Sequence, residues 1–275
     1  MQLNDQVIQL LHRQTIAWPL AAANYSALSH VKTKKLSING FDFTVQFNPA
    51  RIISSAANTD PQAIKERKCF LCRHHLPPEQ ESFPYTAQSG NKYFILCNPY
   101  PIFPRHLTIS DDHHTDQLIF GRVDDMLELA EKLTDFVIFY NGPKSGASAP
   151  DHFHFQAGNK GFLPIQSLVE SGTSLVHYPV PALVFTSDEI DAATTCLHQN
   201  PEPMLNLLCW KTGHTFYIVI FPRKRHRPSQ FYARGETNIL FTPGAIDLGG
   251  VLITPLEKDF CKLTAADVSD IFTQI

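Results

Sequence analysis

The sequence predicts an α+β fold with a mostly antiparallel sheet and packed helices. Two observations support this class. Short apolar segments with strand-like patterns follow one another through turn-rich connections along most of the chain. Helical periodicity is clear only near the start, in the middle and at the end of the 275 residues.

The first half of the chain supplies a helix and several strands. Apolar residues at helical spacing, beginning with Leu3 and Val7, predict an amphipathic helix at the start. Alternation with period two predicts a strand at 41–47, and "KYFILC" and "RHLTIS" predict two more, joined by a proline-rich connection. Residues 115–135 show the strongest helical pattern, and "FVIFY" after them predicts a short buried strand.

The second half is less regular. Beyond Gly158 the pattern weakens until "MLNLLCW" and "TFYIVIF", which predict a hairpin around "KTGH". In the predicted last helix, Thr264 caps the first turn and Asp267 reciprocates. No linker separates two domains, yet "IFPRHLTI" and "VIFPRKRH" resemble each other, which fits two related halves. We therefore expect residues 1–170 and 171–275 to form two halves packed against each other.

The composition is that of a globular protein without a polyanion-binding surface. With 43% hydrophobic and 18% charged residues and a formal net charge of -3, nucleic acid is not an expected partner. The start lacks the charged and apolar regions of a signal peptide, and no segment is long and apolar enough to span a bilayer. We expect a cytoplasmic protein with no membrane partner. The oligomeric state stays open, a homodimer included.

Cys69 and Cys72 form a C-x-x-C pair, the spacing at which two thiolates reach one zinc ion. A redox dithiol is disfavoured because the flanks are charged and proline-rich, and two unrelated buried cysteines are a further alternative. The other cysteines stand alone and are expected to be buried apolar side chains: Cys97, Cys196, Cys209 and Cys261.

A zinc site would need two more ligands from elsewhere in the chain. The candidate histidines are His74, His75, His106, His113, His114 and His152. Either His113 or His114, together with His152, would join three distant segments around a closed, four-coordinate ion. Such a zinc would be structural.

The segment "DHFHFQ" alternates as a half-buried strand does. His152, His154 and Gln156 then share one face, while the two phenylalanines between them point into the core. With His152 at the metal, His154 is free to attack phosphorus, because imidazole is largely neutral near pH 7. Gln156 can donate to a phosphoryl oxygen while remaining uncharged. An ordinary strand with a polar face is the alternative; the cysteine pair and the loop before the strand favour the catalytic interpretation.

That loop is made of small residues whose amides can approach an anion closely and whose hydroxyls can donate. They are Asn141, Gly142, Ser145, Gly146, Ala147 and Ser148. Lys144 adds a positive charge. Two basic clusters could bind phosphates: Arg105-His106, and "PRKRHRP", which contains Arg223. A solvated surface loop is the alternative interpretation of the second.

The string "NGPKSGASAPDHFHFQ" resembles the active-site segment of the histidine-triad (HIT-like) superfamily, in the branch where glutamine replaces the third histidine. That H-x-H-x-Q branch contains galactose-1-phosphate uridylyltransferase, diadenosine tetraphosphate phosphorylase (ATP adenylyltransferase) and GDP-galactose phosphorylase. The resemblance implies that His154 attacks the α-phosphorus and becomes a nucleotidyl-histidine. It also implies that Gln156, Asn141 and Ser148 contact the phosphoryl group, and Arg223 another phosphate.

Other stretches extend this resemblance. Bacterial uridylyltransferases bind zinc through a C-x-x-C pair, a histidine that follows a strand, and the first histidine of the motif. The matching positions here are Cys69, Cys72, His113 and His152. Because "MLNLLCWKTGHTFYIVIFPRKRH" and "PGAIDLGGVLI" resemble the diadenosine tetraphosphate phosphorylases, residues 1–170 are expected to be a HIT-like catalytic half and 171–275 a phosphorylase-like half.

Two departures bear on the substrate. Serine usually stands three residues before the first histidine, whereas Ser148 stands four before His152, so Ser145 is an alternative to it. Phe153 stands where the uridylyltransferases have proline, and their sugar-binding residues cannot be placed in this sequence.

The expected function is a nucleotidyltransferase or phosphorylase with a covalent nucleotidyl-His154 intermediate. Its substrate would be a nucleoside polyphosphate or a nucleotide sugar, its acceptor phosphate or a sugar phosphate, and its cofactor a structural zinc. Two alternatives are hydrolysis of the same substrates and nucleotide binding without turnover by a zinc-stabilised protein.

Overall fold

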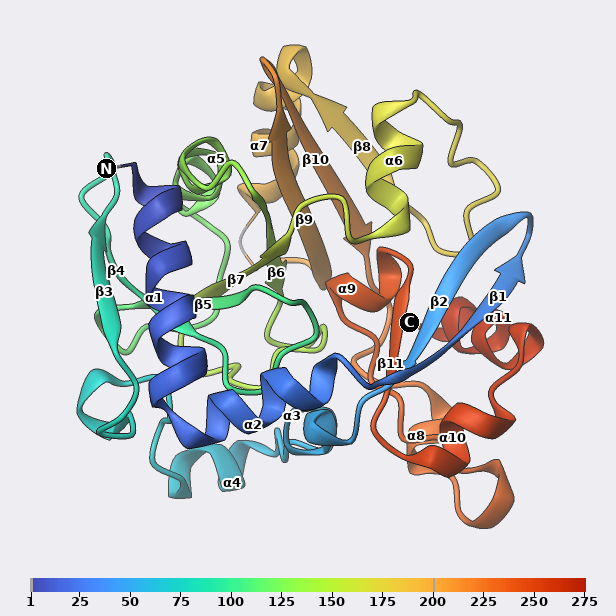
Figure 1. The fold of residues 1–275 in the computed structure, drawn as a ribbon. Coiled ribbons are helices and arrows are strands. Elements are labelled where there is room, and N and C mark those ends of the chain that lie inside the picture. The colour runs from blue at the N-terminus through green and yellow to red at the C-terminus, as the bar shows by residue number, and fades with distance from the viewer. Residues whose placement is uncertain (1, 200) are drawn as a thin grey trace.

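The computed structural model describes residues 2–199 and 201–275, and an eight-stranded sheet lies at its centre (Figure 1). In spatial order its strands are β3 (Ser82–Thr86), β4 (Lys92–Cys97), β5 (His106–Asp111), β7 (His154–Asn159), β6 (Phe136–Asn141), β9 (Leu205–Thr212), β10 (Thr215–Pro222) and β8 (Leu183–Thr186). All neighbours in this sheet are antiparallel. The predicted α+β class with a mostly antiparallel sheet is therefore confirmed.

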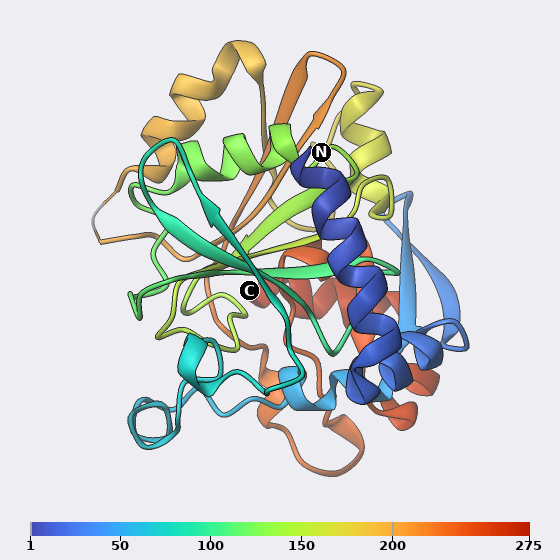
Figure 2. The same cartoon turned by 60° about the vertical axis from the view of Figure 1, so that its left-hand side comes forward.

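A second, three-stranded sheet joins the two ends of the chain. Its strands are β1 (Lys32–Ile38), β2 (Phe41–Phe47) and β11 (Val251–Thr254). The first two form an antiparallel hairpin, and β11 runs parallel to β2. Figures 1 and 2 both show this blue hairpin beside the red C-terminal elements, where helix α11 (Ala265–Gln274) packs on β1.

Two hydrophobic cores cover the two faces of the large sheet. The first contains residues of α1 (Leu3–Ala17), α5 (Val123–Lys132) and α7 (Ile190–Leu197). The second contains residues of the small sheet, α6 (Pro164–Glu170), α9 (Ala245–Leu248) and α11. The remaining helices are α2 (Pro19–Leu28), α3 (Ile52–Ser55), α4 (Pro61–Glu66), α8 (Ser229–Tyr232) and α10 (Glu257–Lys262), with 3-10 turns η1 (Pro49–Arg51), η2 (Arg73–His75), η3 (Ser187–Glu189) and η4 (Gly235–Thr237).

The alternation predicted for the histidine strand is present in β7. Phe153 and Phe155 are fully buried in the first core. His154 and Gln156 point to the opposite face, toward a cavity between the large sheet and the C-terminal elements. The strand itself begins at His154, so His152 lies just before it. The period-two pattern thus places one face of β7 in the core and the other at a cavity.

The predicted helix over residues 115–135 is shorter in the structure. It starts at Val123, because Gly121 adopts a left-handed backbone conformation with φ 71° that a helix cannot include. Leu118, counted in the helical pattern, is 41% exposed on the segment before it. The capping box of Thr264 and Asp267 on α11 is present as expected.

The expected division after residue 170 coincides with the end of α6. Strands from both sides of it join the same large sheet, and the division into two halves remains a prediction. Among residues 2–199 and 201–275, no helix has both the length and the apolar character needed to cross a bilayer.

Candidate active site and metal centre

A cavity of about 410 Å³ opens beside β7. Five residues predicted to act on substrate line it: Asn141, Gly146, Ser148, His154 and Gln156. One part of its wall is apolar and includes Trp18, Leu71 and Leu96. Pockets of a few hundred Å³ with apolar walls and a few convergent polar groups are typical of small-molecule sites.

The His154 ring is held in one tautomer. Its Nδ1 lies 2.9 Å from the backbone oxygen of His152, and since a carbonyl only accepts, Nδ1 carries the proton. Its Nε2 therefore has a free lone pair, and no protein group in the described ranges hydrogen-bonds it. Burial lowers the pKa of His154 to about 4, so the ring is neutral at pH 7. This is the protonation state that a nucleophilic imidazole needs.

The backbone at His154 is fixed by a residue that the sequence reasoning missed. Gln117 is fully buried, and its Oε1 accepts from the His154 amide at 2.7 Å. Its Nε2 donates to the carbonyl oxygens of His154 and Asn141, both at 3.0 Å. One side chain thus joins the end of β6 to the start of β7. Nothing in the pattern around Gln117 distinguishes it from a surface glutamine.

Asn141 presents its amide nitrogen to the cavity. Its Oδ1 accepts from the Ala245 amide at 2.8 Å and from Asn206 Nδ2 at 2.6 Å. Two donors on the oxygen turn the other end of the amide away from them. Asn141 can therefore donate to an anion in the cavity; its contact with a phosphoryl group stays a prediction.

The other loop residues divide between the cavity and the protein interior. Ser148 lines the cavity, whereas Ser145 is fully buried, so Ser148 is the better placed of the two serines. Gly146 has φ 95°, and a Cβ there would come 3.0 Å from the Pro243 oxygen. Its amide donates to His226 Nδ1 at 3.3 Å rather than toward the cavity.

Lys144 and Arg223, two predicted substrate contacts, lie away from the cavity. Lys144 lines a second cavity of about 360 Å³ together with Arg225 and Arg227. Arg223 is only 8% exposed, and it donates to the side chain of Asn206 and to three backbone carbonyls. These acceptors take the hydrogen bonds of its two terminal nitrogens, and its Nε is buried without a partner among the described residues. It supports the Asn206 amide behind Asn141. The phosphate contact predicted for Arg223 stays a prediction.

Arg51 is the cationic residue that the structure places at the main cavity. Its Nη1 donates to the Tyr100 oxygen at 2.8 Å, and its Nε is buried without a partner in the described residues. Burial lowers the pKa of Arg51 to about 10, which keeps it charged at pH 7. Asp247, also on the wall, accepts from two backbone amides, and burial raises its pKa to about 6. No motif marks Arg51, which stands in a turn-rich segment.

A second group of side chains lies at the start of β7, on the side of the cysteine pair. Cys69, Cys72, His114 and His152 each offer one ligand atom, all within 4.8 Å of one another. His152 Nδ1 is 3.3 Å from Cys69 Sγ and 3.5 Å from Cys72 Sγ, and His114 Nδ1 is 3.2 Å from Cys72 Sγ. Zinc–sulfur bonds of about 2.3 Å and zinc–nitrogen bonds of about 2.0 Å at a tetrahedral angle separate N and S by about 3.5 Å. The four side chains fit zinc.

His114, not His113, is the histidine that the structure brings to this group. The His113 side chain is 75% exposed and its Nδ1 lies 3.9 Å from Asp111 Oδ1, outside the cluster. The sequence left the two open and favoured His113, because adjacent residues on an irregular segment cannot be told apart by spacing. His114 Nε2 lies 3.7 Å from a carboxylate oxygen of Asp151, the kind of partner that orients metal-binding imidazoles.

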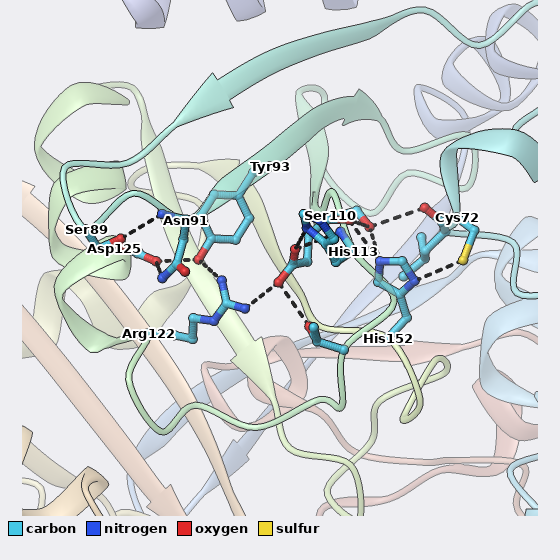
Figure 3. Close-up of polar contacts among 12 residues, drawn as sticks. Cys72, Ser89, Asn91, Tyr93, Ser110, His113, Arg122, Asp125 and His152 are labelled. Atoms are coloured by element: carbon cyan, nitrogen blue, oxygen red, sulfur yellow. Dashed lines mark hydrogen bonds and ion pairs between the residues drawn. The ribbon is translucent and has the colours of Figure 1, made fainter.

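His152 is oriented by polar groups behind it, as Figure 3 shows. Its Nε2 lies 3.0 Å from the Asp111 backbone oxygen and 3.0 Å from Ser110 Oγ, so Nε2 carries the proton and Nδ1 faces the sulfurs. The Asp111 carboxylate in turn accepts from Arg122, which also donates to Tyr93 Oη at 2.9 Å. Burial opposes ionisation of Cys69, yet His152 and two backbone amides hold the pKa of its thiol at about 6. A thiolate is the form that binds metal.

Comparison with known proteins matches two family models and a curated relative to parts of the chain. Residues 10–159 match the family model described as Domain of unknown function (DUF4922), and residues 171–275 match the model "GDPGP1-like, C-terminal domain". A galactose-1-phosphate uridylyltransferase from Halalkalibacterium halodurans is 25% identical over 149 residues, which cover 46% of this chain and 29% of that protein. The match thus spans less than a third of the length of this relative.

Among solved structures, yeast Ap4A phosphorylase Apa2 has the same fold. It superposes with a TM-score of 0.67 at 17% identity, over 100% of this chain and 98% of that one. Its complex with Ap4A gives a TM-score of 0.62 at 18% identity. The HIT-like fold and the resemblance to the H-x-H-x-Q branch are confirmed. Since the first family model matches more than half of the residues, the chain belongs to the family described as Domain of unknown function (DUF4922).

Proposed function

We propose that the protein is a nucleotidyltransferase or phosphorylase that acts on a nucleoside polyphosphate or a nucleotide sugar. One observation carries the proposal: the neutral His154 presents an unprotonated Nε2 to a cavity that also contains Gln156, Asn141 and Ser148. The uridylyltransferase relative and the fold of Ap4A phosphorylase support the same chemistry.

In the first step, the lone pair of His154 Nε2 attacks the α-phosphorus of the nucleotide. A nitrogen–phosphorus bond forms, the bond to the bridging oxygen breaks, and the leaving phosphate or sugar phosphate takes that electron pair. The proton on Nδ1 stays hydrogen-bonded to the His152 carbonyl, which stabilises the positive charge on the ring. Donors from Gln156 and Asn141 stabilise the charge that spreads over the phosphoryl oxygens.

In the second step, an oxygen of the acceptor attacks the same phosphorus and His154 leaves as neutral imidazole. With inorganic phosphate as acceptor, the product is a nucleoside diphosphate. Gln156 is an amide and has no titratable proton to give, so the site favours leaving groups that depart as stable anions, as phosphates do. This favours phosphorylated acceptors over water.

The polar and the apolar walls of the cavity are proposed to bind different parts of the substrate. Arg51 is proposed to pair with a phosphate next to the transferred one, since it lies on the cavity wall and is charged at pH 7. The apolar wall with Trp18, Leu71 and Leu96 is proposed to hold the nucleobase. Lys144, Ser145 and Arg223 have no part in this proposal because of where they lie.

We further propose that Cys69, Cys72, His114 and His152 hold a structural zinc ion. All four positions are filled by protein, so the ion would have no open coordination site for substrate. When bound, zinc joins the cysteine segment, the segment after β5 and the start of β7. His152, held there, supplies the carbonyl oxygen that fixes the His154 tautomer.

The test is to trap the intermediate and vary the acceptor. Incubation with nucleotides labelled at the α-phosphorus should yield acid-labile labelled protein, and His154→Ala should yield none. Release of nucleoside diphosphate should require added inorganic phosphate. Release of nucleoside monophosphate at a rate that does not depend on added phosphate would show that the protein is a hydrolase instead. If the wild-type protein binds nucleotides but no label is ever trapped and none turns over, the protein is a nucleotide-binding protein without catalysis.

A further inference from the structure

Two buried polar side chains contact Gln156, and the chemistry above does not use them: His106, which lies away from the cavity, and Asn98, which lines it. His106 is fully buried at the start of β5, and Asn98 follows β4 with 9% of its surface exposed. His106 Nε2 is 3.1 Å from Gln156 Oε1, and Asn98 Nδ2 is 3.4 Å from the same oxygen. Buried polar groups at the wall of a site need an explanation, because unpaired they destabilise the fold.

The tautomer of His106 follows from its other neighbour. The backbone amide of Ile102 donates to His106 Nδ1 at 3.2 Å, so Nδ1 carries no proton. Burial and the nearby charge of Arg51 lower the pKa of His106 to about 3, so the ring is neutral and its one proton is on Nε2. His106 Nε2 is therefore a donor, and the atom of Gln156 that faces it must be the amide oxygen.

Asn98 leads to the same orientation independently. Its Oδ1 accepts from the Tyr100 amide at 3.0 Å, which leaves Nδ2 to donate to Thr108 Oγ1 at 3.1 Å and to Gln156 Oε1. Two donors thus converge on one oxygen of Gln156. A rotated amide would set its own NH₂ group against both of them and leave them unpaired in the interior.

The His106 ring itself is held on two sides. Phe103 meets it edge-on at 5.4 Å between ring centroids, and Phe139 lies at 5.9 Å. Gly158, opposite His106 in the sheet, leaves room for this arrangement, since a Cβ there would come 2.4 Å from the Phe103 ring. The position of the donor nitrogen is therefore set by packing as well as by hydrogen bonds.

We propose that His106, assisted by Asn98, is a positioning residue that holds the Gln156 amide with its NH₂ group toward the cavity. The inference rests on the proposed function, in which that NH₂ group donates to an oxygen of the transferred phosphoryl group. An amide fixed in advance needs no rotation when charge develops there, and this is the condition under which a donor stabilises a transition state most. His106 does not touch the substrate in this role.

A double-mutant cycle separates positioning from general support of the fold. His106→Met removes the donor with little change of volume and should lower kcat roughly 10- to 100-fold, the scale of a misplaced contact. In a Gln156→Ala background the same change should have an effect of less than about twofold, because the amide it positions is gone. His106→Gln, which can place an amide nitrogen near Nε2, should recover part of the lost kcat. Equal losses in both backgrounds would overturn the proposal.

Tyr25→Phe is the matched control. The Tyr25 hydroxyl donates to the His106 carbonyl at 3.0 Å and accepts from the His106 amide, but it does not contact Gln156. Removal of this hydroxyl changes the backbone contacts of His106 but not its contact with Gln156. It should leave kcat within about twofold of wild type. A loss as large as that of His106→Met would assign the effect to local packing and contradict positioning.

One measurement is independent of activity, so the two proposals fail separately. Ring-nitrogen NMR of His106 in the intact protein should show a proton on Nε2, none on Nδ1, and no titration between pH 5 and 8. A proton on Nδ1, or titration in that range, would exclude the positioning role even if nucleotide transfer is found. Conversely, the expected NMR pattern in a protein that transfers no nucleotide would leave the fixed amide in place and refute only the proposed function.

Discussion

His152 and His154 stand two residues apart, yet their surroundings give them opposite properties. His152 turns Nδ1 to two thiols and donates from Nε2 to a carbonyl, whereas His154 donates from Nδ1 and leaves Nε2 free. Burial lowers the pKa of His152, but contacts with Cys69 and the Asp111 carbonyl outweigh burial and raise this pKa. Burial lowers the pKa of His154 to about 4. The two rings expose different nitrogens because a carbonyl accepts from Nε2 of His152 but from Nδ1 of His154.

The comparison shows how one short strand can serve two sites. The group with the thiols is buried except at His114, while the His154 side opens into a cavity of about 410 Å³. A hydrogen bond from the His154 ring nitrogen Nδ1 to the His152 backbone carbonyl connects the two. Substitutions on the two sides should therefore separate into loss of chemistry and loss of stability.

The largest effect is expected on the cavity side. His154→Ala should lower turnover by at least about 10⁴-fold, because the nucleophile is lost. Zinc content and thermal unfolding midpoint should stay near wild type, since His154 is no ligand. Elemental analysis, calorimetry and a steady-state assay on the same preparation test this. A variant that loses zinc along with activity would show that the two sites are not separable.

On the metal side, Cys72→Ser should abolish zinc binding. Loss of a structural metal is expected to cost about 3 kcal/mol and to lower the unfolding midpoint by about 6–12 °C. Chelator treatment of the wild type should give a similar decrease. Cys261→Ser is the control, because Cys261 is exposed and outside the cluster. An unchanged midpoint in Cys72→Ser would argue against a structural metal.

Within the cavity, Arg51→Gln should reduce kcat/KM about 10- to 150-fold, the loss of a charge-assisted hydrogen bond worth about 1.5–3 kcal/mol. Arg225→Gln, an exposed basic residue at the second cavity, should leave kcat/KM unchanged. Steady-state kinetics with a nucleoside polyphosphate measure both. If Arg225 rather than Arg51 carries the effect, the phosphates extend into the second cavity.

The smallest effect concerns the choice between adjacent histidines. His114→Ala should weaken zinc binding at least about tenfold and lower the unfolding midpoint less than Cys72→Ser does, since three ligands remain. His113→Ala should change neither quantity, because its side chain is largely in solvent. Zinc titration against a competing chelator compares them. The reverse ranking would restore the assignment favoured by the sequence.

The parts of the site predicted from sequence are those governed by short-range rules. Period-two alternation placed His154 and Gln156 opposite the buried phenylalanines, and the C-x-x-C spacing located half of the metal cluster. Both depend on residues within one strand or one turn. The predicted start of α5 was wrong because the apolar spacing continues across Gly121, whose left-handed conformation a helix cannot include.

The parts not predicted depend on long-range packing. Arg51 reaches the cavity because the segment after β2 crosses beside the C-terminal elements, and no local pattern encodes that position. Arg223 was expected to bind phosphate; the structure shows that backbone carbonyls accept hydrogen bonds from its terminal nitrogens, a contact set that no local pattern encodes. His106 and Asn98 meet Gln156 only once β4, β5 and β7 are paired.

The parallel pairing of β2 with β11 has a consequence for synthesis of the protein. Val251 pairs with Thr44, roughly 200 residues earlier in the chain, and this slow, non-local contact closes only after the residues of β11 have left the ribosome. Arg51 lies in the turn η1 after β2 and Asp247 precedes β11, so two parts of the cavity wall meet in the same late event. A nascent chain therefore has its histidine strand long before the two walls of this cavity are brought together.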